Sequence, residues 1–591
     1  MAYPKLTPQS TSRNIIDAFK GYNHNLLIGD GEFFETKNLT SQYYPMLAPR
    51  MKRTVIENLT APQGMIEKDA LAYVDNGTLY YNRTATPVTG LSSGEKQIVS
   101  MGAYILIWPD KKYYNTQNAN DYGSMEADFT YQGTVTYEMC GADGVVFENI
   151  TSSATEPVDP VDGQYWLDTG SSTLSLKVYS ISMKTWTTIE TVYTKVTFTT
   201  TGQIPSKFSE YDGVEVSGLW MNDLNGSKIL YAVGGVENTV SDYVVLVGIC
   251  SESPHTETGN VEIKRTVPNM NYVCECQNRI WGCFYGNDGT QNLNEIYCCA
   301  LGDFKNWRQY LGLSTDSYTA SCGSDGVWTG CINYLGYPTF FKENVIHIVS
   351  VSSTGAHQIR EMPARGVQKG SARSLAIINE TLYYKSRTDV CAYQGSFPQS
   401  VSYALADEKY YNARAGVFGD RYYICMQDSS NDWHLFVYDA KKGLWMHEDN
   451  LKVNFFAKVD DELYAMTDTQ LRGLNGLIGT KEADIEWECT TGIMHYERAS
   501  GDNRSNKKTV KYISRFDLRA KMPLGSEMNM YIEYDSSGMW EYAGTMRMNA
   551  TKMVVFPVKP KRCDHLRINI KGKGDIRLFS IAMNLEKGSD Y

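Results

Sequence analysis

The sequence has no long apolar segment. No apolar run approaches the roughly 20 residues that a membrane-spanning helix needs, and residues 1–25 lack the charged segment and apolar core of a signal peptide. We therefore expect a soluble protein that is made in the cytoplasm. The net charge is −11, from 67 acidic and 56 basic residues. Such a chain has no overall positive field that would attract it to nucleic acid or to an anionic membrane. Binding to either would need a local basic patch.

Cysteine and histidine spacings of metal sites are also lacking. The 13 cysteines are odd in number in a chain of 591 residues, which favours reduced thiols in the core over a disulfide framework. A group of them lies between residues 274 and 331, but its close pairs are spaced as strand residues and not as the loop pairs of a zinc site. His347 lies in an apolar strand and is expected to have one hydrogen-bond partner. We predict no metal and no cofactor, with zinc as the minor alternative.

Catalytic motifs are equally scarce. Residues 90–94 have the spacing of a nucleophile elbow with Ser92 as the nucleophile, but that elbow precedes a helix, and residues 98–108 are patterned as a strand. Residues 460–462 are acidic but fall at a predicted turn, where solvated carboxylates are the usual case. Residues 324–328 match poorly the box of Ser, Asp, Gly, Thr and Trp that sialidases carry in their propeller blades. We predict that the chain is not an enzyme and has no catalytic or cofactor-binding residues; a hydrolase using Ser92 is the minor alternative.

The sequence is rich in aromatic residues and in turn formers. Aromatic residues make up 12% of the chain, with 42 Tyr and 49 Gly, and this mixture favours sheet over helix. The segment at 76–81, Asn-Gly-Thr-Leu-Tyr-Tyr, returns at 379–384 as Asn-Glu-Thr-Leu-Tyr-Tyr. Turn residues at 278, 336, 379, 420 and 461 are separated by steps of 58, 43, 41 and 41, of which the last three are nearly equal. A step near 40 is typical of a four-stranded propeller blade.

We predict an all-β protein built on a β-propeller of six to eight blades, with seven as the best guess. The expected regions are an extended N-terminal arm (1–50), the propeller (51–124 and 216–476), a small inserted β domain (125–215) and a C-terminal antiparallel β-sandwich (477–591). The insert is inferred because the interval from 102 to 225 is too long for one repeat. The sandwich is inferred from strict apolar and polar alternation near residues 566–578. Unrelated hairpins in two β-sandwiches are the alternative to the propeller.

Six stretches contain Gly, Asn or Pro, and all of them except 366–375 also contain Trp, Tyr or Phe. They lie at 38–50, 278–283, 300–307, 336–343, 366–375 and 393–396. In these stretches the chain resembles a family of structural proteins of tailed bacteriophages, the stabilisation or tail hub and nozzle proteins. The likeness covers mainly 20–110 and 270–475.

This resemblance implies a non-enzymatic virion component located in the tail or neck and assembled in the host cytoplasm. Related phages build a homo-oligomeric ring, commonly a hexamer, below the portal and adaptor. Its channel passes viral DNA during ejection, and tail fibres attach outside. The resemblance supplies no catalytic residues.

A subunit lining a DNA conduit should not bind phosphate tightly, because each neutralised phosphate adds affinity and would slow transit. We therefore expect a neutral to acidic channel wall. The basic loop 500–508, whose composition predicts a mobile tip, is expected to face elsewhere. The alternative function is a receptor- or glycan-binding propeller module that uses Tyr165 and Trp166 of the insert, although such residues are more often the core of a small domain.

Overall fold

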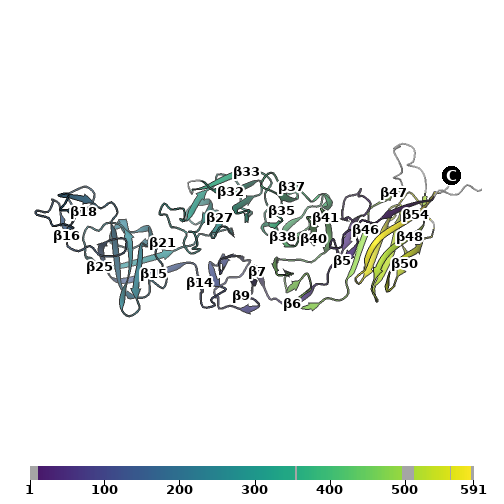
Figure 1. Cartoon of the computed structure of the whole chain (residues 1–591), viewed down its shortest axis with the longest axis horizontal. Coiled ribbons are helices and arrows are strands. Elements are labelled where there is room, and N and C mark those ends of the chain that lie inside the picture. The colour runs from purple at the N-terminus through teal and green to yellow at the C-terminus, as the bar shows by residue number, and fades with distance from the viewer. Residues whose placement is uncertain (1–10, 353–355, 496–510, 560, 588–591) are drawn as a thin grey trace, which may run out of the picture.

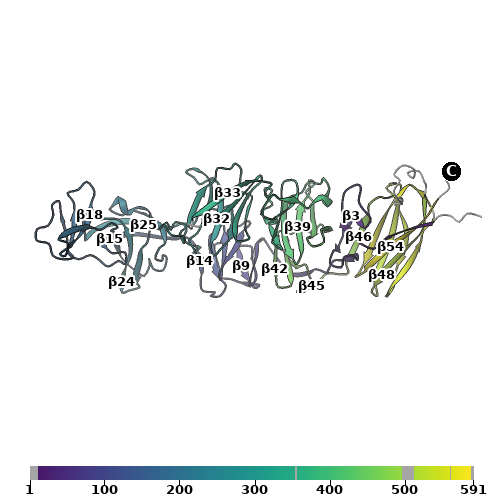
Figure 2. The same ribbon diagram turned by 45° about the horizontal axis from the view of Figure 1, so that its top comes forward.

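The computed structural model describes residues 11–352, 356–495, 511–559 and 561–587. Helical structure within these residues is limited to the 3₁₀ turns η1 (Asn222–Leu224), η2 (Ala372–Ser374) and η3 (Tyr403–Leu405). The protein is all-β, as the composition predicted. Figure 1 shows an elongated molecule with three bodies in a row, and the turned view of Figure 2 keeps the same order. The described part of the chain holds no helix with the length and apolarity to cross a membrane.

The middle body is a ring of seven antiparallel units of four strands each. In each of the first six units, the four strands follow one another along the chain. The seventh is completed by a strand from near the N-terminus, β6 (Thr54–Asn58), which pairs with β44. The units are β7–β10 (Pro62–Lys68, Ala70–Asp75, Thr78–Tyr81, Thr84–Ala85), β11–β14 (Gln97–Met101, Tyr104–Trp108, Lys112–Asn115, Tyr122–Ser124), β26–β29 (Tyr272–Glu275, Ile280–Asn287, Asn292–Cys298, Tyr318–Ser321), β30–β33 (Gly330–Tyr334, Tyr337–Lys342, Val345–Val351, His357–Pro363), β34–β37 (Ala376–Ile378, Thr381–Lys385, Val390–Tyr393, Gln399–Ser400), β38–β41 (Tyr411–Phe418, Arg421–Gln427, Trp433–Asp439, Leu444–Asp449) and β42–β44 (Phe455–Val459, Glu462–Met466, Gln470–Gly473) with β6.

The units contact one another in a closed order. The pairs in contact are β7 with β11, β11 with β26, β26 with β30, β30 with η2, η2 with β38, β38 with β42, and finally β42 with β7. Separate apolar clusters fill the spaces between neighbouring units; Leu71 and Tyr73 of the first unit, for example, pack with Phe455 and Met466 of the seventh. A four-stranded unit alone cannot bury both faces, so each one depends on its neighbours for a core.

Repeated turns give the units their common shape. Asn76 and Gly77 both have positive φ, and so do Asn379 and Glu380 at the equivalent turn. Two consecutive residues with positive φ form the hairpin turn whose twist matches that of the flanking strands. The sequence repeat therefore marks a local backbone requirement that the ring uses again.

The body inserted after the second unit is larger than predicted. Its seven-stranded sheet has the order β22 (Gly226–Ile229), β21 (Gly213–Ser217), β25 (His255–Arg265), β15 (Ala127–Cys140), β20 (Tyr193–Thr201), β24 (Val240–Val247) and β23 (Ala232–Val236). A second sheet contains β16 (Ile150–Ser153), β17 (Tyr165–Asp168), β18 (Ser175–Ser180) and β19 (Thr185–Thr188). The predicted boundary at 215 is wrong, because β25 pairs with β15 from Ala127↔Arg265 to Tyr137↔His255 and so belongs to the insert. The ring resumes only at β26.

The C-terminal body has two sheets that share one apolar core. One sheet contains β54 (Arg577–Lys587), β48 (Lys511–Met522), β51 (Ala550–Pro557) and β52 (Arg562–Cys563). The other contains β46 (Glu486–Thr491), β53 (His565–Lys573), β49 (Glu527–Tyr534), β50 (Trp540–Met546) and β47 (Met494–His495). In the seventh ring unit, β45 (Thr480–Lys481) adds to β6.

Strands in the described part of the predicted N-terminal arm pair with strands of these sheets. Strand β1 (Thr11–Ile16) pairs with β54, and β3 (Glu32–Lys37) pairs with β46. Between them, β2 (Gly21–Tyr22) joins β41 of the ring to β3, while β4 (Leu39–Thr40) and β5 (Ala48–Pro49) pair with each other. The predicted extended arm (1–50) is therefore not a region of its own in its described part, because its strands pair with the ring and with the C-terminal sheets. One sheet instead runs from β38 of the ring through β2 and β3 to β50.

Candidate functional site

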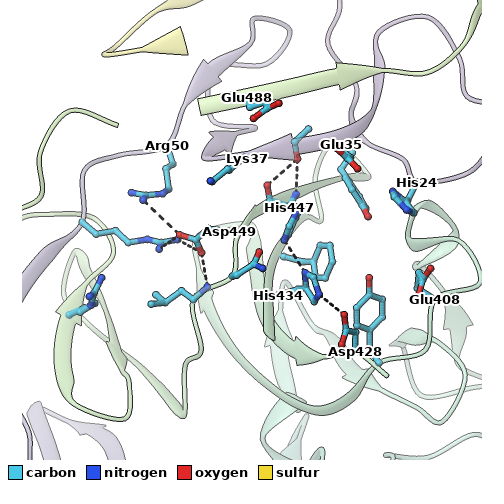
Figure 3. A pocket seen from close by; sticks show the side chains of 18 of the residues that line it. His24, Glu35, Lys37, Arg50, Glu408, Asp428, His434, His447, Asp449 and Glu488 are labelled. Atoms are coloured by element: carbon cyan, nitrogen blue, oxygen red, sulfur yellow. Dashed lines mark hydrogen bonds and ion pairs between the residues drawn. The ribbon is translucent and has the colours of Figure 1, made fainter. Parts of the chain in front are cut away.

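A polar pocket of about 820 Å³ lies where the ring meets the C-terminal body. We call it the junction pocket. Its walls come from N-terminal residues between 22 and 53, from ring residues between 408 and 472, and from Glu482 and Glu488 near the start of the C-terminal sheets (Figure 3). The pocket exists because β2 and β3 bridge the two bodies at this point.

Two histidines and an aspartate form a chain along one wall. Asp428 Oδ2 lies 3.0 Å from His434 Nε2, and His434 Nδ1 lies 3.3 Å from His447 Nε2 (Figure 3). His434 is on β40 and His447 on β41. Because Phe436 is the direct partner of His447, His434 is its diagonal neighbour on the same face of the sheet. Thr36 donates a hydrogen bond to the carbonyl of His447 at 3.0 Å, which ties this chain to β3.

Burial and hydrogen bonds shift the pKa values of His447 and Asp428 in this hydrogen-bonded chain. Burial and the neighbouring His434 lower the pKa of His447 to about 4, so its ring is neutral at pH 7. Desolvation acts to raise the pKa of Asp428, but hydrogen bonds from His434 and from two backbone N–H groups hold it below its usual value. The Asp428 carboxylate therefore stays ionised at one end of this chain, and the His447 ring stays neutral at the other.

A cluster of arginines and carboxylates closes the other end of the pocket. Arg53 has a 3% exposed side chain and contacts Glu448 at 2.7 Å and Asp449 at 2.5 Å. Arg50 pairs with Glu482 and lies 3.8 Å from Asp449. Burial opposes ionisation of Asp449, but the charge and hydrogen bonds of Arg53 outweigh it and lower the pKa of this carboxyl. The cluster binds the N-terminal segment to the last strand of the sixth ring unit and to the segment that enters the C-terminal body.

Aromatic rings and two further carboxylates complete the walls. Tyr22, Tyr410 and Phe436 line the pocket together with Glu35 and Glu408. Burial raises the pKa of the Tyr22 and Tyr410 hydroxyls, which therefore remain hydrogen-bond donors at neutral pH. The pocket combines donors, acceptors and apolar ring faces, a set that suits a ligand rich in hydroxyl groups.

The sequence-derived candidates lie elsewhere. Ser92 precedes β11 with no helix after it, and its hydroxyl contacts Asp110 at 2.5 Å and Lys96 at 2.7 Å. Lys96 has a fully buried side chain that pairs with Asp110 at 2.6 Å, so Ser92, Lys96 and Asp110 form one packed polar cluster at this turn. Glu462, in the acidic run, accepts backbone N–H bonds from residues 475 and 477 and has a structural role.

The aromatic pair of the insert is part of its packing. Trp166 is 6% exposed and meets the edge of Trp186 at 5.4 Å between ring centroids, and Tyr165 stacks on Phe147 at 4.5 Å. The glycan-binding alternative therefore loses the residues on which it was based. The basic loop 500–508 lies outside the described residues.

The cysteines are mostly core residues, as predicted: eleven of the thirteen are buried. Cys274, Cys276, Cys283 and Cys298 pack between the third and fourth ring units. Cys322, however, comes close to His347 and to Glu361. Sequence spacing did not indicate either this group or the junction pocket. The one available signal for the pocket was the position of His434 and His447 on two strands of one hairpin.

No family model matches the chain, and no curated protein matches it. Among solved structures, an exo-β-1,3-galactanase from Phanerochaete chrysosporium is 8% identical and covers 53% of this chain and 94% of its own, with a TM-score of 0.21. A glycoside hydrolase is 10% identical and covers 52% of this chain and 96% of its own, with a TM-score of 0.18. The extracellular domain of a protein described as a hybrid two component system, from B. thetaiotaomicron, is 8% identical over 93% and 98%, with a TM-score of 0.24.

This comparison contradicts the prediction that the chain is not an enzyme, because two of these structures are glycoside hydrolases. We do not keep that prediction. At 8% to 10% identity and TM-scores this low, no substrate or reaction carries over to this chain. None of the three is described as a phage protein, so the resemblance to phage structural proteins stays a prediction.

Proposed function

We propose that the seven ring units are the blades of a seven-bladed β-propeller and that the two C-terminal sheets form a β-sandwich. The cyclic contacts and the separate apolar clusters between neighbouring units support the propeller. Pairing of β6 with β44 then closes the ring by joining residues 54–58 to residues 470–473. Such closure fastens the last blade with a strand from near the N-terminus, and the radial repetition leaves only short, protected sheet edges.

We propose that the protein is a structural component of a tailed-phage virion, a ring-forming tail hub, nozzle or neck protein. The observation that carries this proposal is the sheet that runs from β38 in the sixth blade to β50 in the C-terminal body, joined through β2 by one residue pair with β41 and two with β3. Because backbone hydrogen bonds link the two bodies, neither can rotate without breaking strand pairs. A rigid joint of this kind suits a part that transmits force within an assembly.

The propeller of one chain is not itself the DNA conduit. A cavity lined by residues of β7, β11, β26, β30, β38, β42 and η2 has a volume of only about 260 Å³, and its walls include Lys96, Tyr272, Arg373 and Phe455. Arg373 lies over the ring of Phe455 at 3.7 Å and pairs with Glu95 at 2.8 Å, so these side chains crowd the space. We therefore propose that the channel lies between subunits of a homo-oligomer such as a hexamer, with a neutral to acidic wall, and that portal, adaptor and fibre proteins attach to this ring.

Electron microscopy tests this proposal in two ways. Purified full-length protein, alone or with the portal and adaptor complex of the same particle, should form closed rings with a central channel. Antibodies against the protein should label the tail or neck of intact particles. A protein that stays monomeric under both conditions and leaves the particle unlabelled would overturn the assignment.

The junction pocket supports a second candidate, a receptor- or glycan-binding module. Its carboxylates, imidazoles and tyrosine rings form the polar and aromatic set that binds saccharides. Calorimetry with an oligosaccharide panel should detect binding by the native protein and loss of binding in D428N. Released reducing sugar should be measured on the same panel, so that hydrolysis is distinguished from binding alone. A panel without a binder removes this candidate and leaves the virion proposal intact.

A further inference from the structure

Three possible metal ligands meet between the third and fourth ring units, which lie side by side near β27 and β32 in Figure 1. Cys322 follows the end of β29 in the third unit. His347 on β32 and Glu361 on β33 are direct partners across the fourth sheet, so both side chains leave the same face. The Cys322 sulfur, a ring nitrogen of His347 and a carboxylate oxygen of Glu361 all lie within 4.8 Å of one another.

The spacing suits one small metal ion. A tetrahedral Zn²⁺ site with metal–ligand distances of about 2.0–2.3 Å separates its ligand atoms by about 3.3–3.8 Å. His347 Nε2 and Glu361 Oε1 are 3.3 Å apart. Thiolate, imidazole and carboxylate together favour Zn²⁺ over Mg²⁺ or Ca²⁺, which prefer oxygen ligands alone.

The surroundings orient the histidine toward this point. The His347 side chain is fully buried, and Trp328 packs against its ring with centroids 4.8 Å apart. Its Nδ1 is buried and makes no hydrogen bond, whereas Nε2 faces Glu361 and lies 2.8 Å from the hydroxyl of Ser324. The polar contacts of the ring are thus those of Nε2 with Glu361 and Ser324.

One cation lies beside the group. The ammonium of Lys342 donates to the carbonyl of Ser324 at 2.6 Å and to Asn294 at 3.0 Å, and it lies over the ring of Trp328. These contacts hold the lysine on backbone and amide oxygens. They leave the thiol, the imidazole and the carboxylate available to a metal.

We propose that Cys322, His347 and Glu361 bind one Zn²⁺ and thereby link the third and fourth ring units. The fourth position is open to water or to the hydroxyl of Ser324. Metal binding displaces the thiol proton to solvent and leaves the cysteine as a thiolate. Glu361 has a 42% exposed side chain and provides the route by which the ion enters.

Calorimetry on the folded full-length protein, stripped with a chelator and titrated with zinc chloride, tests the site. We expect one ion per chain, and with Co²⁺ we expect the absorption of a thiolate–cobalt bond. C322S and E361Q should each weaken binding by about a hundredfold or more, with unchanged circular dichroism. The matched control is C331S, which alters another partly exposed cysteine of the same apolar cluster and should bind Zn²⁺ like the native protein.

The zinc-dependent rise in melting temperature provides a second readout. It should appear in the native protein and in C331S and be absent in C322S. The proposal fails if the native protein binds no stoichiometric Zn²⁺, if C331S loses binding as C322S does, or if the cobalt complex lacks the thiolate absorption. It stands or falls independently of the virion assignment.

Discussion

Replacing Arg53 by methionine tests whether the ion cluster of the junction pocket holds the ring and the C-terminal body together. Methionine keeps most of the volume of the arginine stem but removes the charge. Glu448 and Asp449, whose side chains are 6% and 19% exposed, then lose the cation that lies 2.7 and 2.5 Å away. The carboxylates stay in place and lose the positive charge of this arginine.

The magnitude follows from what each carboxylate retains. Removing one partner of a buried ion pair costs about 3–5 kcal/mol. Asp449 keeps Arg50 at 3.8 Å and the N–H of Leu451 at 3.1 Å, so its share of the loss is reduced. We therefore expect a cost at the low end, about 3 kcal/mol. R308M is the control, because Arg308 and Glu215 are 42% and 48% exposed, and such a surface pair contributes about 0.2–1 kcal/mol.

Native-state hydrogen exchange measures this cost locally, which suits a chain of several bodies. Exchange of amides in β6 and β41 should be about a hundredfold faster in R53M at pH 7, the factor that about 3 kcal/mol implies. The pKa of Asp449 is lowered in the folded protein, so the stability it contributes is present at neutral pH and lost as pH falls through that folded pKa. The difference in amide exchange rates between R53M and the native protein should accordingly become smaller below about pH 4. An effect no larger than that of R308M, or one that stays constant at low pH, would refute this account of the junction.

Three further outcomes are expected. The pKa of His447 is about 4 in the folded protein and about 6.5 in the unfolded chain, so the free energy of unfolding should fall by about 3 kcal/mol at most between pH 6.5 and 4, as the unfolded state takes up the proton. Melting curves of H447Q should lack this loss of stability in acid. R373M should destabilise the ring by about 2 kcal/mol in chemical unfolding, because it removes charged hydrogen bonds to the carbonyls of Lys96 and Asn454, while the exposed Glu95 remains solvated. W166A should cost about 3–5 kcal/mol in the unfolding transition of the insert and leave exchange in β6 unchanged.

The sequence predicted the parts of this fold that local chemistry determines. The recurrent turn at Asn76 and Asn379 requires positive φ, and the aromatic residues that follow it fill spaces between units. Both requirements are local, so they recur at a nearly constant step. A class of all-β structure follows from the same residues.

Long-range pairing was outside the reach of these patterns. The end of the insert depends on β15 and β25 forming one long ladder, and nothing in the residues near 215 or 265 specifies a partner more than a hundred positions away. The N-terminal strands are a stronger case, since Thr11 pairs with Glu586. Short polar strands of this kind are stable only because partner strands already exist.

The candidate site was hidden for the same reason. The junction pocket combines residues from three distant segments, so spacing along the chain does not reveal it. His434 and His447 are 13 residues apart, a separation typical of no metal or catalytic motif. Their proximity appears only when β40 and β41 are placed in register.

The N-terminal segment gives the architecture its coherence. Within about fifty residues it contributes β1 and β3 to the C-terminal sheets, β2 to the joint and β6 to the closure of the ring. Each of these strands pairs with a strand that lies several hundred residues later in the chain, apart from the short contact between β2 and β3. Ring closure and attachment of the C-terminal body therefore depend on the same stretch of backbone. Because Arg50 and Arg53 lie between β5 and β6 on this stretch and pair with carboxylates of both later segments, the ion cluster connects the strand that closes the ring to the joint with the C-terminal body.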